Sequence, residues 1–162
     1  MNYFFSILFF VAIVGNAQDL KEIRTQYPQA VGNAEIAAKL NNELASITKS
    51  SQSELQAYKG AVLTLKAKFA KSRSDKKDFF KEGTSFIESA AKAAPSNIEV
   101  RYIRLGVQEN SPKFLGYHKN IEADKGFILK NYKSISSKEL KEIVKDFVLK
   151  SESFSENEKL EF

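Results

Sequence analysis

The residues best suited to chemistry lie between positions 101 and 124, where two arginines, the single histidine and an aspartate occur. Arg101, Arg104 and Gln108 follow at spacings of three and four residues, so they share one helix face. Guanidinium groups on one face suit a carboxylate or phosphate, which makes them a candidate binding face. The structural alternative, which we favour, is that they join neighbouring hairpins through Glu99, Asp124 or carbonyls at a helix end.

His118 stands four residues before Glu122, so both side chains would share one side of a helix. Two ligands make half of a zinc site, and the chain has neither a second histidine nor a cysteine to complete it. We therefore expect no metal and no cofactor, and interpret His118 as a surface imidazole in contact with Glu122. Asp124 lies on the stripe between Ile121 and Ile128, and we interpret it as a capped or paired core aspartate.

Catalytic motifs give no convincing site. Ser-x-x-Lys, which suggests an envelope acyl enzyme, occurs at Ser46, Ser74 and Ser89, without the Ser-Asp-Asn or Lys-Thr-Gly partners. A Ser-His-Asp set, a phosphate loop and a dinucleotide fingerprint are also missing from the sequence. The sequence therefore predicts a protein that is not an enzyme. An envelope enzyme of unrecognised class, built from the two arginines, His118 and Asp124, is the least favoured alternative.

A cluster of positive charge lies in segment 66–81, where seven basic residues face only two acidic ones, Asp75 and Asp78. The basic cluster consists of Lys66, Lys68, Lys71, Arg73, Lys76, Lys77 and Lys81. Such a cluster suits a peripheral contact with an anionic membrane surface or an acidic partner. The alternative that we favour is a solvated turn that keeps the protein soluble.

Residues 1–17 have the pattern of a secretory signal peptide. The apolar core spans Phe4–Val14, and Gly15 and Ala17 supply the small residues of a cleavage site. A spanning helix needs about 20 apolar residues, which is longer than this run, although an uncleaved anchor stays an alternative. We expect export and cleavage near Ala17–Gln18, giving a periplasmic or secreted protein. Export argues against a nucleic-acid partner despite the formal net charge of +5.

Helical spacing of apolar residues predicts a single all-α domain over residues 18–150, with six or seven helices. The expected helices run from Asp19 to Tyr27, Asn33 to Lys49, Ser53 to Phe69, Asp75 to Ala94, Ile98 to Glu109, Pro112 to Tyr132 and Ser136 to Lys150. Pro28 is expected to end or kink the first helix, and Ser136 with Glu139 to form a capping box. Residues 151–162 are polar and acidic, so we expect a frayed tail.

Gly60 and Gly83 lie inside the two longest expected helices, and each costs about 1 kcal/mol of helix propensity relative to alanine. Close approach of two helix backbones would explain why glycine is kept at both positions. We therefore predict that Leu55–Phe69 and Phe79–Ala94 form an antiparallel hairpin. The chain has no cysteine, so its stability must come from apolar packing.

A repeat-like pattern occupies the region after Gly83. Its spacing of small, large apolar, alanine and proline residues is given by Gly83, Ile87, Ala90 and Pro95, and it is followed by Tyr102, Leu105 and Gly106. This pattern resembles about one and a half tetratricopeptide-type helical repeats, with Glu109 in place of an expected aromatic residue. The run from Pro95 to Tyr102 also resembles small exported helical proteins with no assigned activity. The resemblance implies antiparallel hairpins stacked in a right-handed array, and protein binding as the usual role.

Two function hypotheses follow. The favoured one is a protein-interaction or scaffold module of the cell envelope, which binds an envelope protein or peptide in an exposed groove. The candidate binding residues are Val100, Arg101, Ile103, Arg104, Val107 and Gln108. Val100, Ile103 and Val107 would form the groove wall, so their complete burial would contradict the groove. The alternative is a carrier of a hydrophobic ligand or lipid, in which some of the thirteen phenylalanines line a cavity between helices.

Overall fold

The computed structural model describes residues 15–162, so most of the expected signal peptide lies outside the described residues. The described chain is all helical, as predicted, and has no strand. Its elements are α1 (Gly15–Ala30), α2 (Ala34–Glu43), α3 (Ser53–Phe69), α4 (Arg73–Ala93), α5 (Ile98–Glu109), the 3₁₀ helix η1 (Lys113–Leu115), α6 (Ile121–Asn131), the 3₁₀ helix η2 (Tyr132–Ser134), α7 (Lys138–Lys150) and α8 (Glu156–Lys159).

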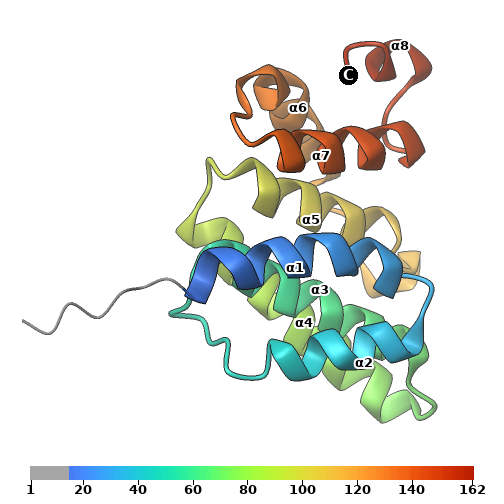
Figure 1. The fold of residues 1–162 in the computed structure, drawn as a ribbon. Helices are drawn as coiled ribbons and strands as arrows, with labels where there is room; N and C mark the ends of the chain where they lie inside the picture. The colour runs from blue at the N-terminus through green and yellow to red at the C-terminus, as the bar shows by residue number, and fades with distance from the viewer. Residues whose placement is uncertain (1–14) are drawn as a thin grey trace, which may run out of the picture.

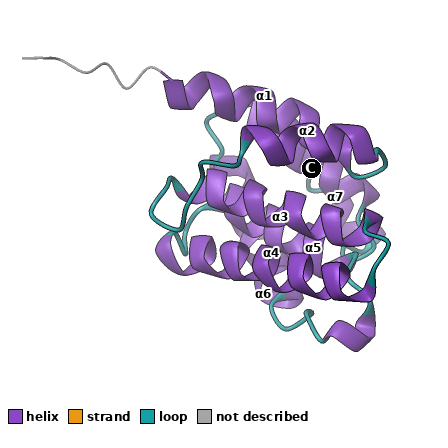
Figure 2. Ribbon diagram, turned by 90° about the horizontal axis from the view of Figure 1, so that it is seen from below, coloured by secondary structure: helices purple, strands orange, loops and turns teal. Residues whose placement is uncertain are grey.

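Helix α5 connects the two halves of the molecule (Figure 1). On one side it packs against the α3–α4 hairpin, which α1 and α2 cover, and on the other it contacts α6 and α7. Figure 2 shows α1 and α2 lying together over α3. A continuous core of buried apolar residues runs from Leu20 in α1 to Phe154 after α7. Helix α5 is therefore in contact with other helices on two sides.

The α3–α4 hairpin is held by direct contact between two helix backbones. A Cβ atom added at Gly60 would lie 2.5 Å from the carbonyl oxygen of Gly83, and one added at Gly83 would lie 2.5 Å from that of Gly60. Real Cβ atoms do not approach an oxygen this closely, so any larger residue would force the helices apart. The predicted close crossing of these two glycines is confirmed.

Two asparagine caps place helix starts where the sequence predicts them. The Asn33 side chain accepts hydrogen bonds from the backbone N–H groups of Glu35 and Ile36, at 2.9 and 3.2 Å. Asn97 does the same at the start of α5, where it accepts from the next two free N–H groups at 3.0 and 3.2 Å. These bonds satisfy N–H groups that have no partner within the helix. The bounds of α5 match the prediction at both ends.

The predicted C-terminal ends of the first two helices are wrong. Helix α1 continues past Pro28 to Ala30, because the proline falls in its last turn, where the lost N–H bond interrupts little further helix. Helix α2 ends at Glu43, six residues before the predicted end at Lys49. After α2 the chain does not continue as the predicted helix. It is held there by Lys59, whose Nζ donates to the carbonyls of residues 45 and 47 at 3.1 and 2.6 Å.

The helix predicted from Pro112 to Tyr132 is also wrong, because it is split into two elements. The 3₁₀ helix η1 ends at Leu115 and is followed by Gly116, whose φ of 67° is left-handed and stops helical hydrogen bonding. Helix α6 begins only after a short irregular segment, at Ile121. The capping box predicted at Ser136 is displaced too: Ser137 caps α7 by accepting from the N–H of Leu140 at 3.2 Å.

The C-terminal segment 151–162 packs on the domain instead of fraying as expected. Phe154 is 3% exposed, and the Phe162 ring lies 4.5 Å from the Tyr132 ring, centre to centre. Ser155 and Glu158 form the capping box of α8. The polar composition of the segment hid these two aromatic anchors, and their burial corrects the prediction.

Candidate functional site

The two arginines of α5 form a buried ion-pair network with Asp124 of α6. Arg104 donates to both carboxylate oxygens of Asp124 at 2.7 Å, and Arg101 Nη1 donates to one of them at 2.8 Å. The Asp124 side chain is completely buried. Arg101 also donates to the carbonyl of Pro95, at the end of the preceding hairpin, at 2.7 and 3.0 Å. The arginines therefore join α5 to α6 and α4, as the structural interpretation predicts.

The rest of this polar face is also satisfied within the protein. Arg104 donates to Glu88 Oε2 at 3.0 Å, and Tyr117 donates to the other oxygen of Glu88 at 2.7 Å. Gln108 is fully buried and accepts from the backbone N–H of Asn120 at 2.9 Å. Burial lowers the pKa of Arg104, but the hydrogen bonds to Asp124 together with the negative charges of Asp124 and Glu88 outweigh that effect and raise it overall. This face has no free guanidinium to offer a ligand.

A second buried network, which the sequence reasoning missed, pairs Glu99 with Arg24. Arg24 donates to both oxygens of Glu99 at 2.7 and 2.6 Å, and the Tyr58 hydroxyl donates to one of them at 2.9 Å. The hydrogen bonds to Glu99 raise the pKa of Arg24, while burial raises that of Tyr58. Glu99 was expected to serve the arginines of its own helix, and no local spacing indicates a partner 75 positions away.

His118 forms no hydrogen bond with the buried acid–base groups of the described chain. Its Nε2 is 3.0 Å from the carbonyl oxygen of Ser111, and it sits in an irregular segment before α6. The predicted contact with Glu122 depends on a helix that is not formed there, and Glu122 instead lies 3.9 Å from Lys125. Within residues 15–162, no group of three or more metal-binding side chains is found.

The predicted groove wall is not exposed. Val100, Ile103 and Val107 are 0%, 1% and 7% exposed, because α5 is covered by helices on several sides. The prediction of an exposed groove lined by these three residues is therefore wrong. Ile103 and Val107 nevertheless border a cavity, whereas Val100 packs into the core.

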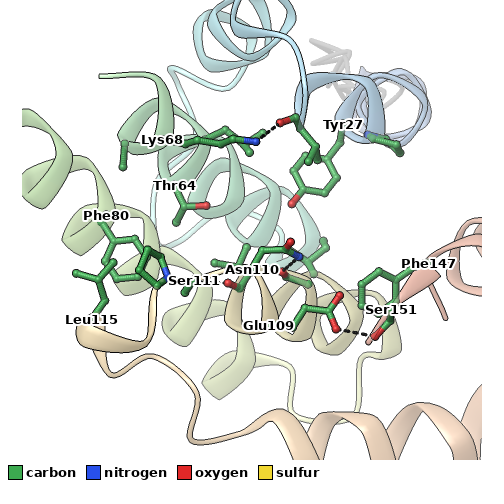
Figure 3. Close-up of a pocket in the computed structure, with 18 of the residues that line it drawn as sticks. Tyr27, Thr64, Lys68, Phe80, Glu109, Asn110, Ser111, Leu115, Phe147 and Ser151 are labelled. Atoms are coloured by element: carbon green, nitrogen blue, oxygen red, sulfur yellow. Dashed lines mark hydrogen bonds between the residues drawn. The ribbon is translucent and has the colours of Figure 1, made fainter. Parts of the chain in front are cut away.

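This cavity has a volume of about 1230 Å³ and lies where α1, α3 and α5 end and α4 begins, with α7 closing one side (Figure 3). Its floor is formed by buried side chains from three helices: Tyr27, Leu65, Tyr102, Ile103 and Val107. Phe80 and Phe147 lie at its sides. The close-up shows the Tyr27 ring facing the end of α5 across the space. Most of its lining is therefore apolar.

Polar side chains in the cavity wall are largely used within their own helices. Thr64 and Ser111 donate to backbone carbonyls three or four residues earlier, at 2.7 and 2.6 Å, and Asn110 does so at 2.8 Å. Glu109 accepts from Ser151 at 2.6 Å, which ties α5 to the segment after α7 (Figure 3). These bonds leave few neutral polar groups free to orient a ligand, so the charged side chains of the lining are the groups best suited to contact a polar headgroup.

The mouth of the cavity is basic. Four members of the basic cluster line it and form what we call the basic rim: Lys68, Arg73, Lys76 and Lys77. Lys68 donates to the backbone carbonyl of Val31 at 2.9 Å, across the opening (Figure 3). Among the ion pairs of the described chain, none uses any of the seven cluster residues. The rim thus carries unpaired positive charge.

The other three cluster residues lie outside the cavity. Lys66 Nζ sits 4.3 Å from the centre of the Phe79 ring, while Lys71 and Lys81 are exposed. The apolar spacing of α1, α3 and α5 indicated core positions and gave no sign that some of them border a cavity. Only the basic cluster, visible in the sequence, marked this region.

Comparison with known proteins adds no assignment. No family model matches the chain, and no significant match was found among curated proteins or solved structures. The resemblance to tetratricopeptide-type repeats therefore stays a prediction. None of the helices in the described chain combines the length and apolarity that membrane crossing requires.

Proposed function

We propose that this protein binds a single-chain anionic amphiphile, of the fatty-acid type, with the chain in the cavity and the headgroup at the basic rim. The observation that carries the proposal is the joint placement of an apolar space and unpaired cations at its mouth. Ligand pockets usually measure about 300–1,000 Å³, and the cavity of about 1230 Å³ is large enough for an acyl chain. If the expected signal peptide is cleaved, the carrier would act outside the cytoplasm.

This proposal is preferred to the protein-interaction module for a structural reason. The module depended on an exposed wall at Val100, Ile103 and Val107 and on a free arginine face. The three apolar residues are buried, and Arg104 is bound to Asp124 and Glu88. A peptide recognised through those residues would have to displace buried ion pairs, which is costly.

The first experiment measures the affinity of delipidated protein for a series of fatty acids from octanoate to palmitate by titration calorimetry. Each added methylene buried in the cavity should contribute about 0.8 kcal/mol, or about fourfold in dissociation constant. The matching fatty alcohols lack the carboxylate that the basic rim would attract, so they should bind more weakly. Affinity that does not depend on chain length would overturn the proposal.

A variant test places the ligand in the cavity. Val107→Phe adds volume on the cavity floor and should reduce fatty-acid affinity at least tenfold, since the ring occupies space that the chain needs. Leu149→Phe, on an exposed α7 position outside the cavity, serves as control and should bind as the wild type does. Circular dichroism would verify that both variants fold. Equal binding by both folded variants would show that the ligand sits elsewhere.

A further inference from the structure

The exposed apolar side chains are concentrated beside the cavity mouth. Five large hydrophobic residues of the described chain are exposed, and three of them, Val31, Phe114 and Leu115, line the cavity. Phe114 is 87% exposed, although phenylalanine is among the residue types most often buried. We call Phe114 and Leu115 the lip.

The lip is a short, defined projection. It forms the 3₁₀ turn η1, with Pro112 before it and the left-handed Gly116 after it. Leu115 lies close to Phe80 of α4 (Figure 3). Gly116 ends the turn in the left-handed conformation, and the Phe114 side chain is left almost completely exposed.

Positive charge lies next to this projection. Arg73, Lys76 and Lys77, on the first turns of α4, line the same cavity as the lip and form no ion pair in the described chain. An apolar side chain that enters the boundary between headgroups and acyl chains, beside cations that contact lipid phosphates, is a common arrangement for peripheral membrane binding. A protein partner would more often meet a broad, well-packed surface than one projecting ring.

We propose that the lip inserts into an anionic bilayer, with Arg73, Lys76 and Lys77 on the lipid headgroups, so that the cavity mouth faces the membrane. An amphiphile can then pass between bilayer and cavity without crossing water. This inference goes beyond ligand binding, because docking needs no ligand in the cavity. The partner is an anionic lipid surface, and its attraction to the cluster is a matter of charge complementarity.

Fluorescence tests the insertion, since the chain contains no tryptophan. Phe114→Trp introduces a single fluorophore at the lip, and Leu160→Trp introduces one at an equally exposed position on the C-terminal side, where Leu160 is 84% exposed. With phosphatidylcholine–phosphatidylglycerol vesicles, the first should shift to shorter wavelength and be quenched by brominated acyl chains. The second should not. Identical responses of the two, or no response from the first, would overturn the proposal.

Charge variants test the cations. Arg73→Gln/Lys76→Gln/Lys77→Gln should weaken binding to the anionic vesicles by roughly 100-fold, at about fivefold for each residue. The control removes the same charge from exposed lysines away from the cavity, as Lys92→Gln/Lys130→Gln/Lys138→Gln, and should change binding only a few-fold. Equal losses in both triple variants would mean that net charge alone attracts the protein, and would overturn the docking site. Vesicle binding by the wild type should also fall as salt increases.

Two variants separate this proposal from ligand binding. Phe114→Ser should lose vesicle binding about tenfold or more. Because Phe114 borders the cavity but is 87% exposed, this variant should lose less fatty-acid affinity than Val107→Phe. Val107→Phe should keep vesicle binding while losing fatty-acid affinity. If Phe114→Ser binds vesicles as the wild type does, the docking proposal fails whatever the fatty-acid result. Capture of a protein in place of vesicle binding would also overturn it.

Discussion

The two sides of α5 use the same helix for opposite purposes. Toward α6, Arg104 and Gln108 are buried and bonded to Asp124 and Asn120. Toward α1 and α7, Ile103 borders an open apolar space of about 1230 Å³. On the first side the polar groups of α5 are buried and hydrogen-bonded within the protein, and on the second side a cavity remains.

This difference shows which charged side chains remain available to bind a ligand or partner. The arginines of α5 are the residues that sequence reasoning would first connect with ligands, yet the fold uses them. The lysines and arginine of α4 are easily dismissed as a solvated turn, yet they have no ionic partner and lie at the mouth of the cavity. Charge that is already paired stabilises the fold, and only unpaired charge can recruit something else.

The largest effect is expected on the paired side. Asp124→Asn leaves two guanidinium groups without their carboxylate in a buried site, which should cost about 3–5 kcal/mol in the free energy of unfolding. Urea denaturation followed by circular dichroism would measure it. Glu122→Gln, two residues away but 84% exposed in its side chain, should change stability by less than about 0.5 kcal/mol. A small loss for Asp124→Asn would remove the contrast between the two sides.

Alkaline pH should destabilise the protein almost as much. Burial raises the pKa of Tyr27, Tyr58 and Tyr102 above the usual value of 10.0. Above that value the unfolded chain releases these protons while the folded chain holds them, so stability is complete below pH 10 and falls as pH rises. Each tyrosine should contribute a loss of about 1.4 kcal/mol per pH unit, or about 4 kcal/mol for three.

Urea denaturation at a series of pH values would measure this slope. Tyr27 lies on the cavity floor, so Tyr27→Phe reports whether that floor is as dry as the core. The pKa values of Tyr117 and Tyr132 are raised by burial as well, so the substitution should reduce the slope by about one fifth to one quarter. An unchanged slope would mean that water already reaches the phenol and that the cavity is hydrated.

Removing single hydroxyl groups should sharpen the comparison. Tyr58→Phe breaks a buried hydrogen bond of 2.9 Å to Glu99, and hydrogen bonds to charged groups contribute about 1.5–3 kcal/mol. Tyr27→Phe, whose hydroxyl takes part in no hydrogen bond described for residues 15–162, should cost about 0.5 kcal/mol or less at neutral pH. Thermal and urea unfolding would measure the loss of stability in both variants. A larger loss for Tyr27→Phe than for Tyr58→Phe would contradict this prediction.

Added volume should be tolerated only on the cavity side. Val100→Phe enlarges a residue with no space around it and should destabilise the protein by about 1–3 kcal/mol. Val107→Phe can direct its ring into the cavity and should cost less than about 1 kcal/mol. Differential scanning calorimetry would compare the two. Equal destabilisation would indicate that the cavity floor is as tightly packed as the core.

The smallest effect on stability is expected at the basic rim. Lys76→Gln/Lys77→Gln removes two exposed, unpaired charges and should change the free energy of unfolding by about 0.5 kcal/mol or less. Urea denaturation would verify this. A substantial loss would mean that the two lysines hold the fold together, as the arginines of α5 do.

Local signals predicted much of the fold, because they act within one helix. Asn33 and Asn97 mark helix starts, and the two helix-interior glycines indicate a crossing that the structure contains. The pairing of Arg101 and Arg104 with Asp124 was also accessible from charge type and position. In contrast, the Arg24–Glu99 pair joins α1 to α5 and has no local spacing to reveal it.

The cavity could not be predicted from periodicity. Ile103 and Val107 have the same helical spacing whether a side chain or empty space lies opposite them, since the pattern records only that one face is apolar. The start of α6 and the packed C-terminal segment were missed for a related reason. Gly116 and Phe154 act through a left-handed turn and a long-range contact, which composition does not register.

The contact between Gly60 and Gly83 has a consequence for recognising relatives. Two backbones that touch exclude every side chain from both positions at once, so related sequences should keep the pair even where their surface has diverged completely. Searching for two helix-interior glycines at this spacing, followed by an asparagine cap and an Arg-x-x-Arg helix, uses geometry in place of overall similarity. Distant relatives could then be recognised by two positions at which only glycine can be accommodated.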